Sequence, residues 1–220
     1  MQCIKDTIKN INIVIGCNIG CSYCYARMNN NRFHTIDDFN KPVFFENKLK
    51  MLDNKRHTAY LLTGQSDLSG WNEEWKDKVF SKMKENENTQ YIFLTKRPEN
   101  INLKETPDNG WFGVTVTSSK EKTRIDYLRN NIKAKHYHIT FEPMFDDVGK
   151  LDLNNISWIV IGTETGNRKG KISSKREWVF NIYNQAKEKN IPVFMKEDLL
   201  GILNEDEFVQ EFPKEFGEMK

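Results

Sequence analysis

Residues 58–95 read TAYLLTGQSDLSGWNEEWKDKVFSKMKENENTQYIFLT, two short β-rich runs separated by an amphipathic stretch. From Trp71 to Lys84, apolar residues recur every four positions, as one face of a helix requires. The flanking runs, Thr58–Thr63 and Tyr91–Thr95, are rich in aliphatic, β-branched and aromatic residues. The segment therefore predicts a strand–helix–strand unit with two parallel strands.

The same alternation continues on both sides of this unit. Further strands are expected at Ile11–Ile15, Trp111–Val116, His136–Phe141, Trp158–Ile161 and Pro192–Met195, and further helices at Glu121–Asn130 and Glu177–Lys189. Such a pattern is typical of an open doubly wound sheet or of a complete or partial barrel. We expect one α/β domain over residues 1–220: a partial (β/α)6 TIM-type barrel, with Pro192–Met195 as an extra C-terminal strand.

Composition and charge exclude several classes of protein. The 220 residues carry a formal net charge of +2, so no global charge favours a nucleic-acid or membrane partner. Apolar stretches such as Trp158–Ile161 are far too short to cross a bilayer, and the N-terminus lacks the features of a signal peptide. We therefore expect a cytoplasmic protein without membrane contact.

Three of the four cysteines, Cys17, Cys21 and Cys24, lie within eight residues in the pattern CxxxCxxC. In a reducing cytoplasm, clustered cysteines favour metal binding over disulfides. Three thiolates on a [4Fe–4S] cluster leave one iron without a protein ligand, and that iron can bind S-adenosylmethionine (SAM). Gly16 and Gly20 allow the tight loop that such a site requires. The pattern predicts a [4Fe–4S] cluster on these three cysteines.

A structural zinc site is the alternative interpretation of the same cysteines. It needs a fourth ligand, which Cys3, His34 or His57 could supply. Zinc knuckles and ribbons usually combine two short cysteine hairpins, and this chain has no second pair. This alternative describes a non-catalytic, zinc-stabilised binding module.

The CxxxCxxC pattern, followed by Tyr25-Ala26 and placed directly after a predicted strand, resembles the radical SAM superfamily. Downstream blocks occur in the order LTGQSDL (62–68), FLTKRP (93–98), WFGVTV (111–116), FEP (141–143), IVIGTETG (159–166) and IPVFMK (191–196). Together they resemble a phage-associated radical-SAM-like family over most of the chain. Many members of that family have a longer insertion between the first two cysteines.

The resemblance implies reductive cleavage of SAM to a 5′-deoxyadenosyl radical, which abstracts hydrogen from a substrate. It also implies an external electron donor of the flavodoxin or ferredoxin type. A nucleic acid or nucleotide is one substrate class, and a small metabolite or peptide is the other. No cysteine follows Cys24, which argues against families that use auxiliary clusters.

The resemblance further implies a SAM site at the strand ends. Its expected residues are Tyr23, Gly64, Gln65, Ser66, Asp67, Thr115, Thr117, Ser118 and Glu142. In this interpretation Asp67 or Ser66 accepts a hydrogen bond from the SAM ammonium group. A turn that caps the next helix explains the same residues equally well.

Charged residues end several predicted strands: Lys96, Arg97, Glu142, Glu164 and Lys196. Among them, Glu142, Lys96 and Lys196 are candidate catalytic residues, although no individual role follows from the sequence. For Glu142, the alternative is a salt bridge to Lys96, Arg97 or Lys196.

A basic segment and a pair of histidines give weaker indications of function. Residues 167–176, NRKGKISSKR, contain five basic residues and no acid, and they should lie over the mouth of the pocket. Such a loop suits a phosphate-bearing substrate or is simply an exposed surface loop. His136 and His138 alternate on one strand face, a pattern that fits a barrel lining or an exposed edge.

Overall fold

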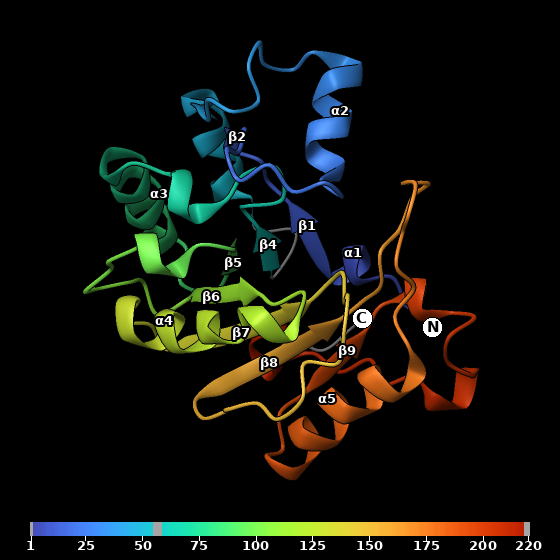
Figure 1. Cartoon of the computed structure of the whole chain (residues 1–220). Helices are drawn as coiled ribbons and strands as arrows, with labels where there is room; N and C mark the ends of the chain where they lie inside the picture. Colours follow the sequence, from blue (N-terminus) through green and yellow to red (C-terminus); the bar gives the residue numbers. More distant parts are fainter. Residues whose placement is uncertain (1, 55–58, 218–220) are drawn as a thin grey trace.

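The computed structural model of the chain describes residues 2–54 and 59–217. At its centre, seven strands form a parallel sheet that curls into a half-barrel (Figure 1). The strand order is β1-β4-β5-β6-β7-β8-β9, and each pair of neighbours is parallel. The strands are Ile8–Asn10 (β1), Ala59–Leu61 (β4), Gln90–Thr95 (β5), Gly110–Thr115 (β6), His136–Phe141 (β7), Ile156–Ile161 (β8) and Val193–Met195 (β9). The predicted parallel α/β sheet is confirmed, and so is its extra C-terminal strand.

The helices lie largely on the convex face of this sheet. They are Ile4–Thr7 (α1), Tyr25–Phe33 (α2), Glu73–Glu85 (α3), Thr123–Asn131 (α4) and Arg176–Glu188 (α5), with 3₁₀ helices at Glu46–Asp53, Leu68–Gly70, Pro98–Asn100, Ser119–Glu121, Glu197–Leu199, Glu205–Glu207 and Lys214–Phe216. The three predicted helices are confirmed as α3, α4 and α5, with ends displaced by one or two residues. Helix α2 was not predicted, since its buried residues are only Ala26 and Asn30.

The prediction of a first sheet strand at Ile11–Ile15 is wrong. Ile8–Asn10 pairs with β4, and the chain then leaves the sheet. Val14–Ile15 (β2) instead pairs antiparallel with Val43–Phe44 (β3) in a separate two-stranded sheet. The apolar run reflects burial, since Ile11 and Ile13 are both core residues, and burial does not by itself specify a pairing partner. Thr58, the predicted start of the second strand, lies outside the described residues, as does His57.

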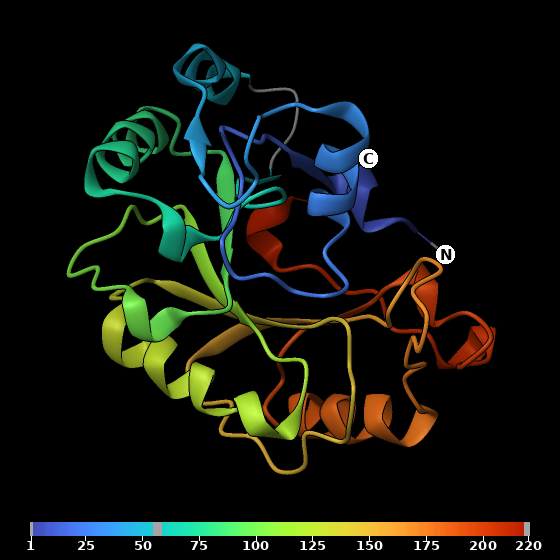
Figure 2. The same cartoon turned by 45° about the horizontal axis from the view of Figure 1, so that its top comes forward.

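The two faces of the sheet contribute to different clusters. Phe93, Phe112 and other outward-facing residues pack under the helices in the main core. Trp111 and Trp158 face into the curl, where the C-terminal Phe216 packs on both of them. Figure 2 shows the C-terminal segment, coloured red, inside the ring of strands. The concave face is therefore filled at its amino end by aromatic side chains.

The gap between the two edge strands, β1 and β9, is bridged by the ends of the described chain. The Gln2 amide donates to Gln210 Oε1 at 2.8 Å, and Gln210 forms an antiparallel bridge with Phe194 of β9. The Cys3 thiol donates to Glu197 Oε1 at 3.0 Å. These contacts hold the half-barrel in its curled shape.

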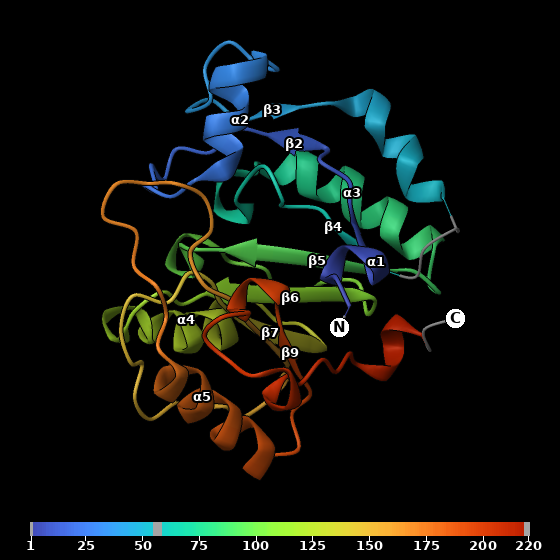
Figure 3. The same cartoon turned by 90° about the vertical axis from the view of Figure 1, so that its right-hand side faces the viewer.

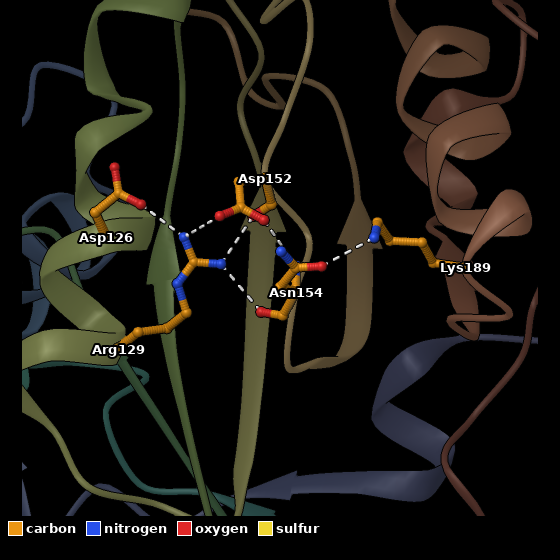
Figure 4. Close-up of polar contacts among 5 residues, drawn as sticks. All are labelled: Asp126, Arg129, Asp152, Asn154 and Lys189. Carbon is orange, nitrogen blue, oxygen red and sulfur yellow. Dashed lines mark hydrogen bonds and ion pairs between the residues drawn. The ribbon is translucent and has the colours of Figure 1, made fainter.

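A polar network joins the outer helices at the amino ends of the strands (Figure 4). Arg129 of α4 donates to Asp126 at 2.6 Å and to the Asp152 carboxylate at 2.9 Å, and it also reaches the Asn154 carbonyl. Lys189, just after α5, donates to the Asn154 side chain at 3.0 Å. The loop before β8 is thus tied to both flanking helices, which leaves the carboxyl ends of the strands as the open end of the half-barrel.

Candidate functional site

A cavity of about 510 Å³ lies in the curl at the carboxyl ends of the strands. Its walls come from both edges and the middle of the sheet, from Asn10 at the end of β1 to Lys196 after β9. Figure 3 shows α2 and the orange loop after β8 rising at this same end of the sheet. In parallel sheets, ligands bind at this end, because loops from separate strands converge there.

The cysteine loop, Cys17–Cys24, is held against one wall of this cavity. The Gly16 amide donates to the Gln65 carbonyl at 3.0 Å, so the loop starts beside the segment that follows β4. Gly16 has φ +113°, and a Cβ there would lie 2.9 Å from the Pro42 Cα. Gly20 has φ +78°. Both glycines therefore serve a backbone path that other residues adopt only under strain.

The three thiols of the loop all line the cavity, and all are free. Burial raises the pKa of the Cys17 thiol to about 11. The Cys24 sulfur accepts a hydrogen bond from the Arg27 amide at 3.4 Å, which makes Cys24 the N-terminal cap of α2. Cys3, in contrast, lies at the sheet edge beside Glu197 and does not line the cavity.

Arg27 supports the loop and was not singled out from the sequence. Its guanidinium donates to the Cys17 carbonyl at 2.7 Å and lies 5.0 Å from the centre of the Phe39 ring. Within the described residues its Nε is buried without a hydrogen-bond partner. Its position one helical turn after Cys24 is the signal that could have identified it, because that spacing directs the side chain back toward the loop.

The segment Gly64–Asp67 adjoins the cysteine loop. The Tyr25 hydroxyl donates to the Gly64 carbonyl, and Ser66 Oγ accepts from the Trp71 indole at 3.0 Å. All four residues of the segment line the cavity. The structure thus brings the predicted SAM segment and the thiols together.

Asp67 has a structural role of its own. Its carboxylate accepts hydrogen bonds from the Ser69 amide (3.0 Å), the Ser69 hydroxyl (2.7 Å), the Thr95 hydroxyl (2.7 Å) and the Lys96 amide (2.8 Å). It caps the short helix Leu68–Gly70 and connects the ends of β4 and β5. The capping interpretation is confirmed, and most of the acceptor capacity of this carboxylate is already used.

The residues expected after β6 separate into two groups. Thr115 is buried and lines the cavity, whereas Thr117 and Ser118 do not. The Thr117 hydroxyl donates to Glu121 at 2.6 Å. Of this group, only Thr115 is in a position to contact a ligand in the cavity.

Tyr23 and Lys96 lie together on the cavity wall. The Lys96 ammonium is 5.6 Å from the centre of the Tyr23 ring, which also packs edge-on against Phe145 at 5.4 Å. Burial raises the pKa of the Tyr23 hydroxyl, so this side chain stays neutral. Arg97 is not among the cavity-lining residues.

An ionic trio, Glu142, Lys196 and Asp198, lies at the ends of β7 and β9. Lys196 contacts Glu142 directly and lies 3.4 Å from Asp198. The predicted salt bridge of Glu142 is therefore confirmed, with Lys196 as its partner. Burial opposes the charge of Lys196, but the two carboxylates outweigh it and raise the pKa of this ammonium group. Lys196 is thus a fixed cation rather than a base.

Glu164 and the basic segment 167–176 form one unit. The Glu164 carboxylate receives Arg168 Nε at 2.5 Å and Nη2 at 2.8 Å, and the hydrogen bond from Arg168 lowers its pKa. Ser174 donates twice to the Thr163 hydroxyl, which anchors the far end of the segment. Arg176 pairs with Glu207 and takes no part in the cavity.

His138 lines the cavity, so the barrel-lining interpretation of this residue is confirmed. Its Nε2 lies 3.0 Å from the Phe93 carbonyl, and burial lowers its pKa to about 4. Nε2 therefore carries the proton, and Nδ1 is a buried acceptor without a partner in the described structure. Gly113 on β6 makes room for the ring, because a Cβ there would lie 2.4 Å from it.

The three cysteines of the loop are residues of the type that ligates a [4Fe–4S] cluster, the group that the resemblance implies. Three thiols of one loop line a single cavity, and an amide hydrogen bond reaches one sulfur. In residues 2–54 and 59–217, no three His, Cys, Asp or Glu side chains converge tightly enough to hold a single metal ion. A cube spreads its ligands over separate irons, so its thiols need not converge on one point. Of the zinc candidates that the structure describes, Cys3 pairs with Glu197, and His34 ends α2.

Comparison with known proteins identifies a family. Residues 2–219 match the family described as "Protein of unknown function (DUF5131)". The chain belongs to this family. A stretch of 98 residues, 44% of the chain, is 35% identical to Lipase 1 of Staphylococcus aureus strains N315 and COL, and the chain spans only 14% of that protein's length. No solved structure matches the chain.

The family description assigns no activity, so the function must be inferred from the residues of the site. In the part of the chain that the structure describes, no helix is both long and apolar enough to span a bilayer.

Proposed function

We propose that this protein is a radical SAM enzyme in which Cys17, Cys21 and Cys24 hold a [4Fe–4S] cluster beside bound SAM. When bound, the cluster supplies the electron that cleaves SAM to methionine and a 5′-deoxyadenosyl radical, which abstracts hydrogen from the substrate. The observation that carries the proposal is the position of the three free thiols, which share one cavity at the carboxyl ends of a curled parallel sheet.

The arrangement of the sheet supports a partial TIM-type barrel, the fold expected for this chemistry. Its strands follow one another in sequence order apart from the separate β2–β3 pair, and helices cover the convex face. The edge strands β1 and β9 do not pair with each other, which distinguishes this sheet from a closed barrel.

The residues around the cavity supply binding and orientation. Asp67 fixes the segment Gly64–Ser66, so that its backbone and hydroxyl groups are presented to SAM in a set geometry. Lys96 is a cation available to a carboxylate or phosphate, whereas Lys196 is held by Glu142 and Asp198 and orients the Glu142 carboxylate on the cavity wall. Tyr23 and Thr115 complete the wall near the cysteine loop.

The surroundings of the enzyme follow from its chemistry. Four free thiols and an oxygen-sensitive cluster are suited to the reducing cytoplasm, where we place the protein. In this proposal the electron comes from an external flavodoxin- or ferredoxin-type donor, the partner that the resemblance implies.

The test is anaerobic reconstitution followed by counting of iron and sulfide. About four irons per chain are expected, with 5′-deoxyadenosine formed once dithionite and SAM are added. Cys21→Ala should lose both the cluster absorbance and the SAM cleavage. Cys3→Ala is the matched control, since Cys3 lies outside the cavity, and it should retain both.

Two outcomes would overturn the proposal. If Cys21→Ala retains the cluster or the cleavage, the thiol loop is not its site. If the protein binds stoichiometric zinc, contains no labile sulfide and leaves SAM intact, the loop is a structural zinc clip and the protein a binding module.

A further inference from the structure

Two elements flank the mouth of the cavity, and neither contains an acidic residue. On one side stands α2, whose residues Tyr25 and Met28 line the cavity. On the other side, residues 165–176 begin as cavity wall at Thr165 and continue away from it. Figures 1 and 3 both show the orange loop rising beside the lower end of α2. The entrance therefore runs between two positively charged or neutral segments.

Helix α2 exposes an apolar stripe that leads away from the cavity. Tyr25 and Met28 are 52% and 55% exposed, although they are large hydrophobic residues. Arg32 follows on the same helical face, since residues three and four positions apart are neighbours on a helix. Its guanidinium lies 5.1 Å from the centre of the Phe33 ring, which is 64% exposed. Flat, apolar and cationic groups thus alternate along this side of the entrance.

The opposing loop presents two lysines on an ordered frame. Glu164 is buried and binds Arg168 in a bidentate pair, and the Ile172 amide donates to the same carboxylate. Arg168 also donates to the carbonyls of Lys169 and Gly170, so the turn is built around its guanidinium. Lys169 and Lys171 are exposed, and no carboxylate of the described residues pairs with either.

One part of the cavity wall combines apolar side chains with an acceptor that has no partner in the described structure. Ile92 and Trp158 line it next to His138, and the Trp158 ring centre lies 6.0 Å from the imidazole. His138 is 1% exposed and its Nδ1 has no partner within the described structure. A flat heteroaromatic ring with an N–H donor satisfies this combination, because it fills apolar space and supplies the missing hydrogen bond.

We propose that the substrate is a single-stranded nucleic acid, which places one unpaired base in the cavity while Lys169 and Lys171 contact its phosphates. This inference rests on the proposed function, which it extends to a substrate class. Single strands bind where cations follow the backbone and aromatic or apolar side chains contact successive bases. A duplex would first have to expel a base from its stack, at a cost that a single strand avoids.

The expected effect of the two lysines follows from counterion release. For single strands, each phosphate contact changes the slope of log K against log salt by about 0.7, so losing two contacts reduces the slope by about 1.4. At about 0.1 M salt this corresponds to roughly 25-fold weaker binding.

The test measures the anisotropy of fluorescein-labelled strands of about twelve nucleotides, made as DNA and as RNA, with the reconstituted protein. Lys169→Ala/Lys171→Ala is compared with Lys104→Ala/Lys133→Ala, which removes the same charge from exposed positions beside the Leu103–Ile132 bridge, ahead of β7. The first pair should weaken binding roughly 25-fold and flatten the salt slope. The second pair should leave both unchanged, and the duplex should bind less tightly than the single strand.

Several results would overturn the inference: no binding of either strand, equal loss in both double variants, a duplex that binds as tightly, or a polyglutamate peptide of equal charge that binds as tightly. The formation of 5′-deoxyadenosine without any oligonucleotide reports separately on the proposed function. A protein that cleaves SAM but ignores nucleic acid keeps the enzyme class and loses this substrate. A protein that binds the strand without cleaving SAM has the nucleic-acid site and lacks the radical chemistry.

Discussion

Replacing Asp67 tests whether this buried carboxylate holds the SAM segment in place. In Asp67→Ala, the backbone amides of Ser69 and Lys96 lose a charged acceptor, and the Thr95 hydroxyl loses its partner. Asp67 is only 7% exposed, so water cannot readily replace the carboxylate. At about 1.5 kcal/mol for each of the two amide bonds, the free energy of unfolding should fall by roughly 3 kcal/mol.

The assay is urea and thermal unfolding of the metal-free protein, followed by circular dichroism. For a domain of this size, about 1 kcal/mol shifts Tm by about 2–4 °C, so Asp67→Ala should melt about 6–12 °C lower. The stability of Asp67→Asn should lie between those of the unsubstituted protein and Asp67→Ala. The asparagine side chain keeps one oxygen as an acceptor, but its NH₂ group faces a hydrogen-bond donor. Asp37→Ala is the matched control: Asp37 is exposed and makes no hydrogen bond in the described structure, so stability should change by less than about 0.5 kcal/mol.

If Asp67→Ala unfolds like the unsubstituted protein, the reasoning from its four hydrogen bonds is wrong. If it keeps normal stability and full iron content but binds SAM more weakly, the carboxylate serves the ligand, as the sequence-based hypothesis proposed. A loss of stability together with a loss of iron identifies Asp67 as a support of the whole cysteine wall.

Three further outcomes are expected. In the metal-free protein, the pKa of about 11 for Cys17 should make alkylation of this thiol at pH 8 about 100-fold slower than alkylation of an ordinary thiol. The rate should rise tenfold per pH unit as the pH approaches that pKa. Alkylation is followed by peptide mass spectrometry, and an ordinary rate at Cys17 would contradict the prediction. Gly113→Ala should cost about 1–3 kcal/mol in urea unfolding because its Cβ meets the His138 ring, and unchanged stability would show that the ring is free to move. Glu164→Gln should speed tryptic cleavage after Arg168, because it loosens the loop that the Glu164–Arg168 pair holds in place. Equal cleavage rates would show that this pair does not order the loop.

Local pattern predicted much of the fold. The four-residue period over Trp71–Lys84 and the β-rich runs on either side correctly indicated α3 and its neighbouring strands, because one-sided burial leaves a periodic trace in sequence. The failure at Ile11–Ile15 has the complementary reason. Its apolar residues are buried as expected, but the choice between two sheets depends on the partner strand.

The candidate site, like the fold, was predicted only in part from the sequence. The carboxyl-end residues Lys96, Glu142 and Lys196 were predicted to meet at one edge, and they line one cavity, since parallel strands end on the same side. Arg27 was not singled out, and His138 was predicted only to line the barrel or to lie at an exposed edge. Their significance depends on a carbonyl in the cysteine loop and on a neighbouring strand, and neither can be identified from residue type.

By itself, the sequence determined the thiol spacing, the parallel α/β sheet and the edge at which polar side chains gather. Each of these features depends on residues that are close together along the chain. The tertiary structure alone decided the pairing of Glu142 with Lys196, 54 residues later, the use of Asp67 as a cap and the unused acceptor of His138. These depend on contacts between distant segments, where burial and geometry select one partner among several that are chemically equivalent.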